Sequence, residues 1–146
     1  IYFFNGHGGN IGTIKTALTG FTADPVLSAA AGHRGPVRVT CANWWDYAPV
    51  MDFCRTRYGA GHGSHATPSE IAVTQFAYPE AVKAVAGIAP KIAPNGRYTD
   101  AADFRAKFPD GRMGSDPTLA MPEDGEVLIG LSAAGLVADY RLFLES

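Results

Sequence analysis

Two glycine-rich loops carry histidines, the side chain best suited to acid–base or metal chemistry near neutral pH. The first loop, Asn5–Asn10, places His7 between a short apolar run and a helical pattern. The second loop, residues 59–65, holds His62 and His65. We expect both loops at the carboxyl ends of strands, where open α/β sheets bind ligands. A single loop histidine is more often structural, but His7 and His65 together favour a functional site.

Glu70 follows His65 by five residues and has two interpretations. The segment 67–70, Thr-Pro-Ser-Glu, has the form of a capping box, in which Glu70 bonds back to the Thr67 amide at a helix start. A carboxylate at that position can also bind a divalent metal together with an imidazole. The spacing favours neither interpretation. His33 has no comparable surroundings in the sequence and is interpreted as structural.

Tandem tryptophans and an acidic residue, Trp44-Trp45-Asp46, follow a predicted strand. One indole in the core and one covering a neighbouring element would explain them structurally. Their alternative is an aromatic wall for a small planar ligand, with Asp46 at the rim. Asn5 and Asn10 flank the first histidine and are expected to fix its turn through side-chain to backbone bonds.

Strand-like and helix-like patterns alternate along the chain. Strands are expected at residues 1–4 and 37–41, and helices at 10–21, 47–58, from Pro68 onward, at 100–108 and from Pro122 onward. Residues 86–98 are expected to be irregular with a short strand. The alternation predicts an α/β fold with a mostly parallel sheet covered on both faces. The chain length of 146 residues suits one domain, 1–146.

Apolar stripes define the expected buried faces of two helices. In the helix 47–58 the stripe is Tyr47, Val50, Met51, Cys54 and Tyr58. In the final helix it is Val127, Leu131, Ala134, Ala138 and Leu142. Gly130 and Gly135 weaken that final helix relative to alanine, which suggests close helix packing.

Composition restricts the partners and the compartment. A net charge of -2 gives no reason to expect nucleic acid, and no apolar run approaches the roughly 20 residues of a membrane span. Cys41 and Cys54 are too few for a disulfide framework and are expected to be free, buried thiols, which fits a cytoplasmic location. The chain opens on an apolar run without an initiator methionine, so we expect it to be the later part of a longer or processed chain.

Four segments resemble the creatininase (creatinine amidohydrolase) family. They are the sequence NGHGGN at 5–10, the aromatic strand end at 43–46, the pattern His-Ala-x-x-x-Glu at 65–70, and Gly-x-Asp-Pro at 114–117 before a terminal helix. The first and third segments are specific in combination. The resemblance covers nearly the whole chain.

The resemblance implies a three-layer αβα sandwich and a metal-dependent hydrolase that opens cyclic or linear amides, often as a hexamer. His7 would be a metal ligand, His65 the catalytic histidine, and Glu70 a carboxylate at a centre holding Zn, Mn or Fe. The implied partner is a small-molecule amide, with substrate-binding residues Trp44, Trp45, Asp46, Gly8, Gly9 and His62. Gly9 replaces the glutamate ligand of creatinine-cleaving members, which argues against creatinine as the substrate.

The family also carries a Glu-x-His pair and a metal-bridging Asp that have no counterpart in this sequence. We therefore expect the sandwich and its metal site to be incomplete without an N-terminal part on the same or another chain. The alternative is a non-catalytic subunit with a structural or binding role.

Overall fold

The computed structural model describes residues 1–26, 37–83 and 87–145, which form two compact units. Unit 1 comprises Ile1–Tyr47 and Ser132–Ser146, and unit 2 comprises Ala48–Leu131. The described residues form five α-helices and a two-stranded parallel sheet, so the α/β prediction is confirmed at this level. The interpretation of His33 as structural lies outside the described residues.

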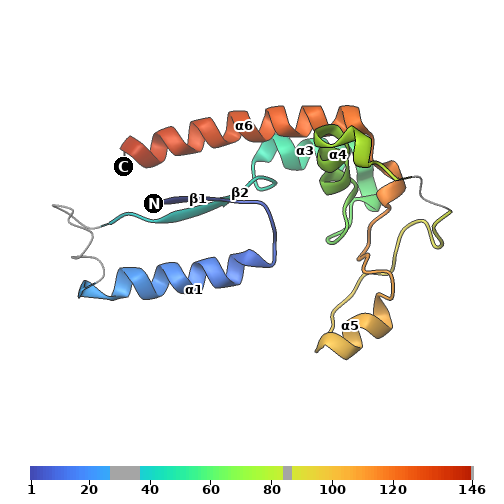
Figure 1. Ribbon diagram of the computed structural model, residues 1–146, viewed down its shortest axis with the longest axis horizontal. Coiled ribbons are helices and arrows are strands. Elements are labelled where there is room, and N and C mark those ends of the chain that lie inside the picture. The colour runs from blue at the N-terminus through green and yellow to red at the C-terminus, as the bar shows by residue number, and fades with distance from the viewer. Residues whose placement is uncertain (27–36, 84–86, 146) are drawn as a thin grey trace. The chain divides into compact units, whose positions relative to one another are not determined.

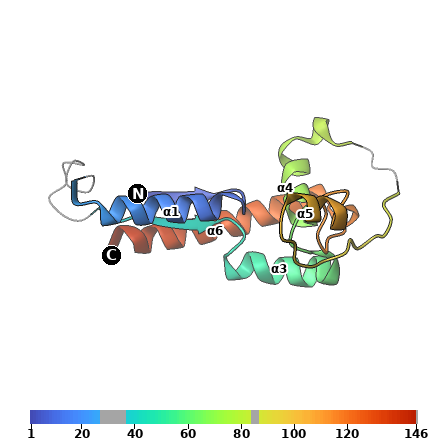
Figure 2. The same cartoon turned by 90° about the horizontal axis from the view of Figure 1, so that it is seen from below.

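Unit 1 is built on the strands β1 (Tyr2–Asn5) and β2 (Thr40–Asn43). They pair in parallel, with Tyr2 opposite Thr40 and Asn5 opposite Asn43. The helix α1 (Asn10–Ala23) lies on one face of the strands, and the part of α6 that belongs to unit 1 lies on the other (Figure 1). Viewed from the α1 side, α1 runs lengthwise in front of the two strands (Figure 2). Unit 1 therefore has helix, strand and helix layers.

Several boundaries in unit 1 differ from the prediction: β1 is shifted by one residue, and β2 ends at Asn43 rather than at residue 41. The strand expected at 37–41 begins only at Thr40, whose N–H donates to the Ile1 carbonyl at 3.0 Å. A strand extends only where it has a partner, and β1 determines where β2 is paired. The helix predicted to end near Phe21 continues to Ala23, and Pro25 lies just beyond its end.

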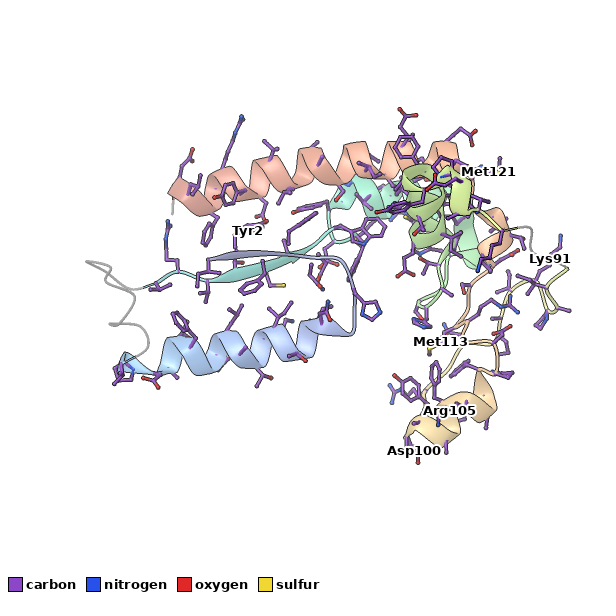
Figure 3. The ribbon with its side chains drawn as sticks, viewed as in Figure 1. Tyr2, Lys91, Asp100, Arg105, Met113 and Met121 are labelled. Carbon is purple, nitrogen blue, oxygen red and sulfur yellow. The ribbon has the colours of Figure 1, made fainter. Side chains whose placement is uncertain are left out.

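The side chain of Tyr2 joins the sheet to α6 (Pro122–Glu145). Its ring packs edge-on against Tyr140 and Phe143, with centroids 5.2 and 5.5 Å apart, and its hydroxyl donates to the Asp139 carboxylate (Figure 3). Burial raises the pKa of the Tyr2 phenol, with a further rise from Asp139. The hydroxyl therefore stays protonated as a donor.

Unit 2 contains the other predicted helices and turns. They are α3 (Ala48–Tyr58), α4 (Pro68–Ala77) and α5 (Ala101–Lys107), with 3-10 turns η1 (Gly59–Gly61), η2 (Pro79–Ala81) and η3 (Pro117–Leu119). The expected N-caps of α4 and α5, Thr67 and Asp100, both accept backbone N–H groups. Of the predicted α3 stripe, Val50, Cys54 and Tyr58 are buried, but Met51 is 53% exposed. Both cysteines are free, as predicted, with Cys41 only partly buried.

The buried face of α6 differs from the predicted stripe. Val127 and Leu142 are exposed, whereas Asp124, Leu128 and Ser132 are buried at a spacing of four residues. Asp124 can face inward because the Arg57 Nε lies 2.9 Å from both of its carboxylate oxygens. The predicted stripe was wrong, and it missed Asp124 and Ser132 because it counted only apolar residues.

The glycines of α6 divide into packed and open positions. A Cβ on Gly135 would lie 2.4 Å from the Tyr47 ring, and one on Gly125 would lie 2.1 Å from the Ala72 carbonyl oxygen. A Cβ on Gly130 would meet nothing within 4 Å. Close packing is thus confirmed for Gly135 and was wrong for Gly130.

The helix α6 is long and apolar enough to cross a membrane, judged by length and composition alone. The sequence interpretation missed this property. The helix contacts Tyr2, Tyr47 and Ala72 of this protein, but only 11% of its most apolar stretch is buried. That the protein has no membrane partner stays a prediction.

A buried arginine organises the segment 87–98, where the expected short strand is absent. Arg112 is only 4% exposed. Its guanidinium donates to the carbonyls of Lys91 at 2.9 Å and Pro90 at 3.1 Å, and to the Asp110 carboxylate at 2.8 Å. The bond from Arg112 lowers the pKa of Asp110, which keeps this carboxylate ionised as an acceptor.

Replacing Gly125 with alanine should destabilise the protein by roughly 1–3 kcal/mol, because the new methyl group would overlap the Ala72 backbone. The matched substitution Gly130→Ala, in the same helix with open space around it, should be neutral or stabilising by up to about 1 kcal/mol. Urea unfolding of both variants measures the difference. Equal effects would contradict the packing described for Gly125.

Candidate active site

Two groups of candidate residues lie in the described structure, one in each unit. The group in unit 1 consists of the His7 turn and the segment 44–46. It lies where β1 and β2 end, with Asn5 and Asn43 as the last paired residues. The Asn5 Nδ2 donates to the Asn43 Oδ1 at 2.7 Å, and the Trp44 N–H donates to the Asn5 carbonyl at 3.3 Å. The structure therefore brings the His7 turn and the segment 44–46 to one carboxyl edge.

The buried amide of Asn5 holds the His7 turn. Its Nδ2 also donates to the His7 carbonyl at 2.8 Å, while its Oδ1 accepts the His7 N–H and the Asn10 Nδ2, each at 3.2 Å. Asn5 is 4% exposed, and its bond to Asn43 is buried, whereas the bonds to His7 and Asn10 are partly buried. The expected bonding of the turn to its backbone is found for Asn5, and Asn10 acts through the side chain of Asn5.

The imidazole of His7 is exposed and folds back over its own turn. Its Nδ1 accepts the Gly9 N–H at 3.2 Å. A Cβ on Gly9 would lie 2.8 Å from the His7 Cε1, whereas one on Gly8 would meet nothing within 4 Å. The absence of a side chain at residue 9 therefore permits this position of the ring.

Trp44, Trp45 and Asp46 border the same edge. The two indoles, both partly buried, meet edge-to-face with centroids 5.9 Å apart. The exposed Asp46 carboxylate accepts the Asn43 Nδ2 at 2.6 Å. This arrangement offers an aromatic surface and an oriented carboxylate, the features expected of a ligand wall.

In unit 2, His65 presents an exposed imidazole from a constrained backbone. The His65 carbonyl accepts the Ser115 Oγ at 2.6 Å and the Met113 N–H at 3.3 Å; Met113 is labelled in Figure 3. The next residue, Ala66, has φ of 52°, in the left-handed region that disfavours residues with a Cβ. Backbone strain of this kind concentrates at functional sites. The ring lies 6.4 Å from that of Phe104 on α5, a neighbour that no sequence pattern near His65 predicts.

Glu70 forms the complete capping box. Its Oε2 accepts the Thr67 N–H at 3.0 Å and the Thr67 Oγ1 at 2.9 Å, and its N–H donates to the Thr67 Oγ1 at 3.3 Å. The capping interpretation is thus confirmed. The metal-ligand interpretation of Glu70 stays a prediction.

His62 lies inside unit 2 against two residues. Its Nε2 is 2.9 Å from the Ser69 Oγ, and its ring stacks on Tyr58 with centroids 5.8 Å apart and planes at 9°. Burial lowers the pKa of His62, with a smaller opposing effect from Glu70. Ser69 is 3% exposed, too buried to attack a substrate, so this Ser–His pair is not a nucleophile with its base. The contact between Ser69 and His62 was not predicted from the sequence, because Ser69 stands at an ordinary position inside the capping box.

The donor set only partly fits a divalent metal. His7 and Glu70 are donors of the right chemical type. However, the His7 Nδ1 and the Glu70 Oε2 already accept hydrogen bonds, and residues 1–26, 37–83 and 87–145 contain no group of three or more His, Cys, Asp or Glu that could hold a metal ion. These residues do not make up a metal site by themselves.

A comparison with protein families now places the chain. Residues 1–139 match the family model described as "Creatininase: Creatinine amidohydrolase". The chain belongs to the creatininase family. No curated protein sequence matches it significantly. The resemblance carried by the four segments is therefore confirmed, and with it an amidohydrolase-like function in a hydrolase family that is generally metal-dependent.

Substituting Gly9→Ala should displace the His7 imidazole, because the added methyl group would lie only 2.8 Å from Cε1. Since the ring is an exposed side chain that can rotate, we expect its 1H and 15N NMR signals to shift while the melting temperature stays within experimental error. Gly8→Ala is the matched control and should leave the His7 signals in place. Identical spectra for both variants would refute the described ring position.

Stability should fall as the pH drops below 6.5, in part through His62. The folded protein holds this histidine neutral because burial lowers its pKa, whereas the unfolded chain takes up a proton near the ordinary value of 6.5. The unfolded state then binds more protons, so the free energy of unfolding decreases on acidification. In His62→Gln, urea unfolding between pH 7.5 and about 5 should show a shallower pH dependence; an unchanged slope would rule out this contribution.

Proposed function

We propose that the protein is a metal-dependent amidohydrolase that cleaves a non-peptide C–N bond in a cyclic amide or a formamide. The presentation of His65 is the observation that carries the proposal. Its imidazole is exposed, while its carbonyl is fixed by Ser115 and Met113 and its successor Ala66 has a strained φ. A fixed backbone with an accessible ring suits a general acid–base residue.

In the proposed reaction, His65 moves the proton. A water molecule adds to the amide carbon, and His65 accepts its proton; the C–N bond then breaks, and His65 returns the proton to the departing nitrogen. The carboxylic acid and the amine leave as products. The exposed position of His65 allows it to reach both atoms in turn.

The remaining assignments are part of the same proposal. His7 and Glu70 would be donors to the metal, with the further donors supplied from outside the described residues. Trp44, Trp45 and Asp46 would form a substrate wall, and Gly8, Gly9 and His62 would contribute to substrate binding. The three-layer αβα sandwich and the homo-oligomer are proposed on the resemblance, and the layers of unit 1 support the sandwich. The cytoplasmic location is proposed on the free thiols of Cys41 and Cys54.

Gly9 supports a substrate other than creatinine. A glutamate at this position would place its Cβ 2.8 Å from the present His7 ring, so the ring could not keep its position. The site of the creatinine-cleaving members therefore requires a different arrangement around His7. We propose lactams, formamides or modified peptides as the substrates to test.

A non-catalytic subunit is the second candidate. The observation in its favour is that the described parts of the chain bring no three metal donors together. In that case the protein would keep the family fold for binding or assembly, and His65→Ala would leave its biological role intact.

The test is an amidase assay of the full gene product in its native assembly, supplied with Zn, Mn or Fe. The substrates are creatinine, simple lactams, N-formyl amines and N-formyl peptides. We expect turnover of one non-creatinine class and a loss of about 10²–10⁴-fold in kcat for His65→Ala. Arg55→Ala, an exposed substitution on α3, is the control and should retain activity. No turnover by the metal-loaded wild type would favour the non-catalytic subunit.

A further inference from the structure

Four polar side chains of unit 2 form a continuous chain of hydrogen bonds between His62 and Glu70. The His62 Nε2 is 2.9 Å from the Ser69 Oγ, which is 2.9 Å from the Thr67 Oγ1, which in turn is 2.9 Å from the Glu70 Oε2. Thr67 and Ser69 are 6% and 3% exposed, so water does not compete at the middle of the chain. We refer to these four residues as the His62–Glu70 chain.

The number of protons fixes the direction of every bond in the His62–Glu70 chain. The Thr67 hydroxyl has one proton and donates it to the carboxylate of Glu70. The Thr67 oxygen can then only accept a hydrogen bond from the Ser69 hydroxyl. Ser69 donates its single proton in that bond. The Ser69 oxygen must therefore accept from His62, so the Nε2 of His62 carries a proton.

Packing holds the first member of the chain in place. His62 stacks face to face on Tyr58, which is 4% exposed, so the ring has a defined plane. In the neutral ring, a proton on Nε2 leaves Nδ1 without one. The His62 ring thus acts as a rigid hydrogen-bond donor aimed at Ser69.

We propose that His62 is a positioning residue that holds the Glu70 carboxylate through Ser69 and Thr67. Without the donor on Ser69, the hydroxyls of Ser69 and Thr67 would be free to reorient, and the carboxylate would lose part of its fixed geometry. The link to catalysis rests on the proposed function, in which Glu70 belongs to the active centre. The effect of His62 on the geometry of Glu70 does not depend on the proposed function.

Two substitutions separate hydrogen bonding from packing at His62. His62→Phe keeps a ring that can stack on Tyr58 but removes the donor. His62→Gln removes the ring but can place an amide N–H near the position of Nε2. If His62 acts as a positioning residue, His62→Gln should keep the Glu70 geometry and His62→Phe should lose it. If His62 acts only through packing, His62→Phe should keep that geometry and His62→Gln should lose it.

The first readout is hydrogen exchange of the Thr67 amide, which donates to Glu70. The Tyr78 amide, which donates to the Thr74 carbonyl at the other end of α4, is the reference for local opening at a helix end. We expect exchange at Thr67 relative to Tyr78 to rise about five-fold in His62→Phe and in Ser69→Ala, the effect of one net hydrogen bond. His62→Gln should match the wild type.

The second readout is the 15N NMR spectrum of His62 in the wild type, which should show a neutral ring protonated at Nε2. The third is the amidase assay, in which kcat of His62→Phe should be about ten-fold below that of His62→Gln. Protonation at Nδ1 alone, or Thr67 exchange unaffected by His62→Phe, would overturn the proposal. An inactive wild type would overturn the proposed function only, because exchange and tautomer need no substrate.

Discussion

The amide of Asn5 is the constraint on which the unit 1 site depends. All four hydrogen bonds of the Asn5 side chain are to other groups of the protein. They join the end of β1 to the end of β2 and to the His7 turn that follows β1. A parallel pair of strands has no connecting hairpin that could align its two ends. The Asn5–Asn43 bond supplies that alignment, and it thereby fixes the distance between His7 and the tryptophan segment.

Features encoded within a few residues were predictable from the sequence. The capping box at Thr67 and Glu70 and the cap at Asp100 were found because donor and acceptor are neighbours in the chain. The family was identifiable for the same reason, since its landmarks are short local patterns. The turn that holds His7 also followed from local signals, although both strands end one or two residues later than predicted.

Features that depend on distant partners were not predictable. The start of β2 is determined by pairing with β1, and the inward face of α6 by the ion pair of Asp124 with Arg57, which lies 67 residues away. Ser69 is ordinary in the sequence, because its link to His62 exists only after α4 and the preceding loop have folded. Apolar periodicity cannot indicate a buried polar side chain whose partner comes from another element.

The buried Arg112 has an evolutionary consequence for the irregular segment that it holds. It binds the carbonyl oxygens of Pro90 and Lys91, and a carbonyl is the same whichever residue carries it. Selection can therefore change the exposed Lys91 side chain while the carbonyl of residue 91 keeps its bond. At this contact the requirement for identity falls on the cation, whose planar fork of donors lysine does not reproduce. Sequence variation among relatives should accordingly be broad at residue 91 and narrow at Arg112.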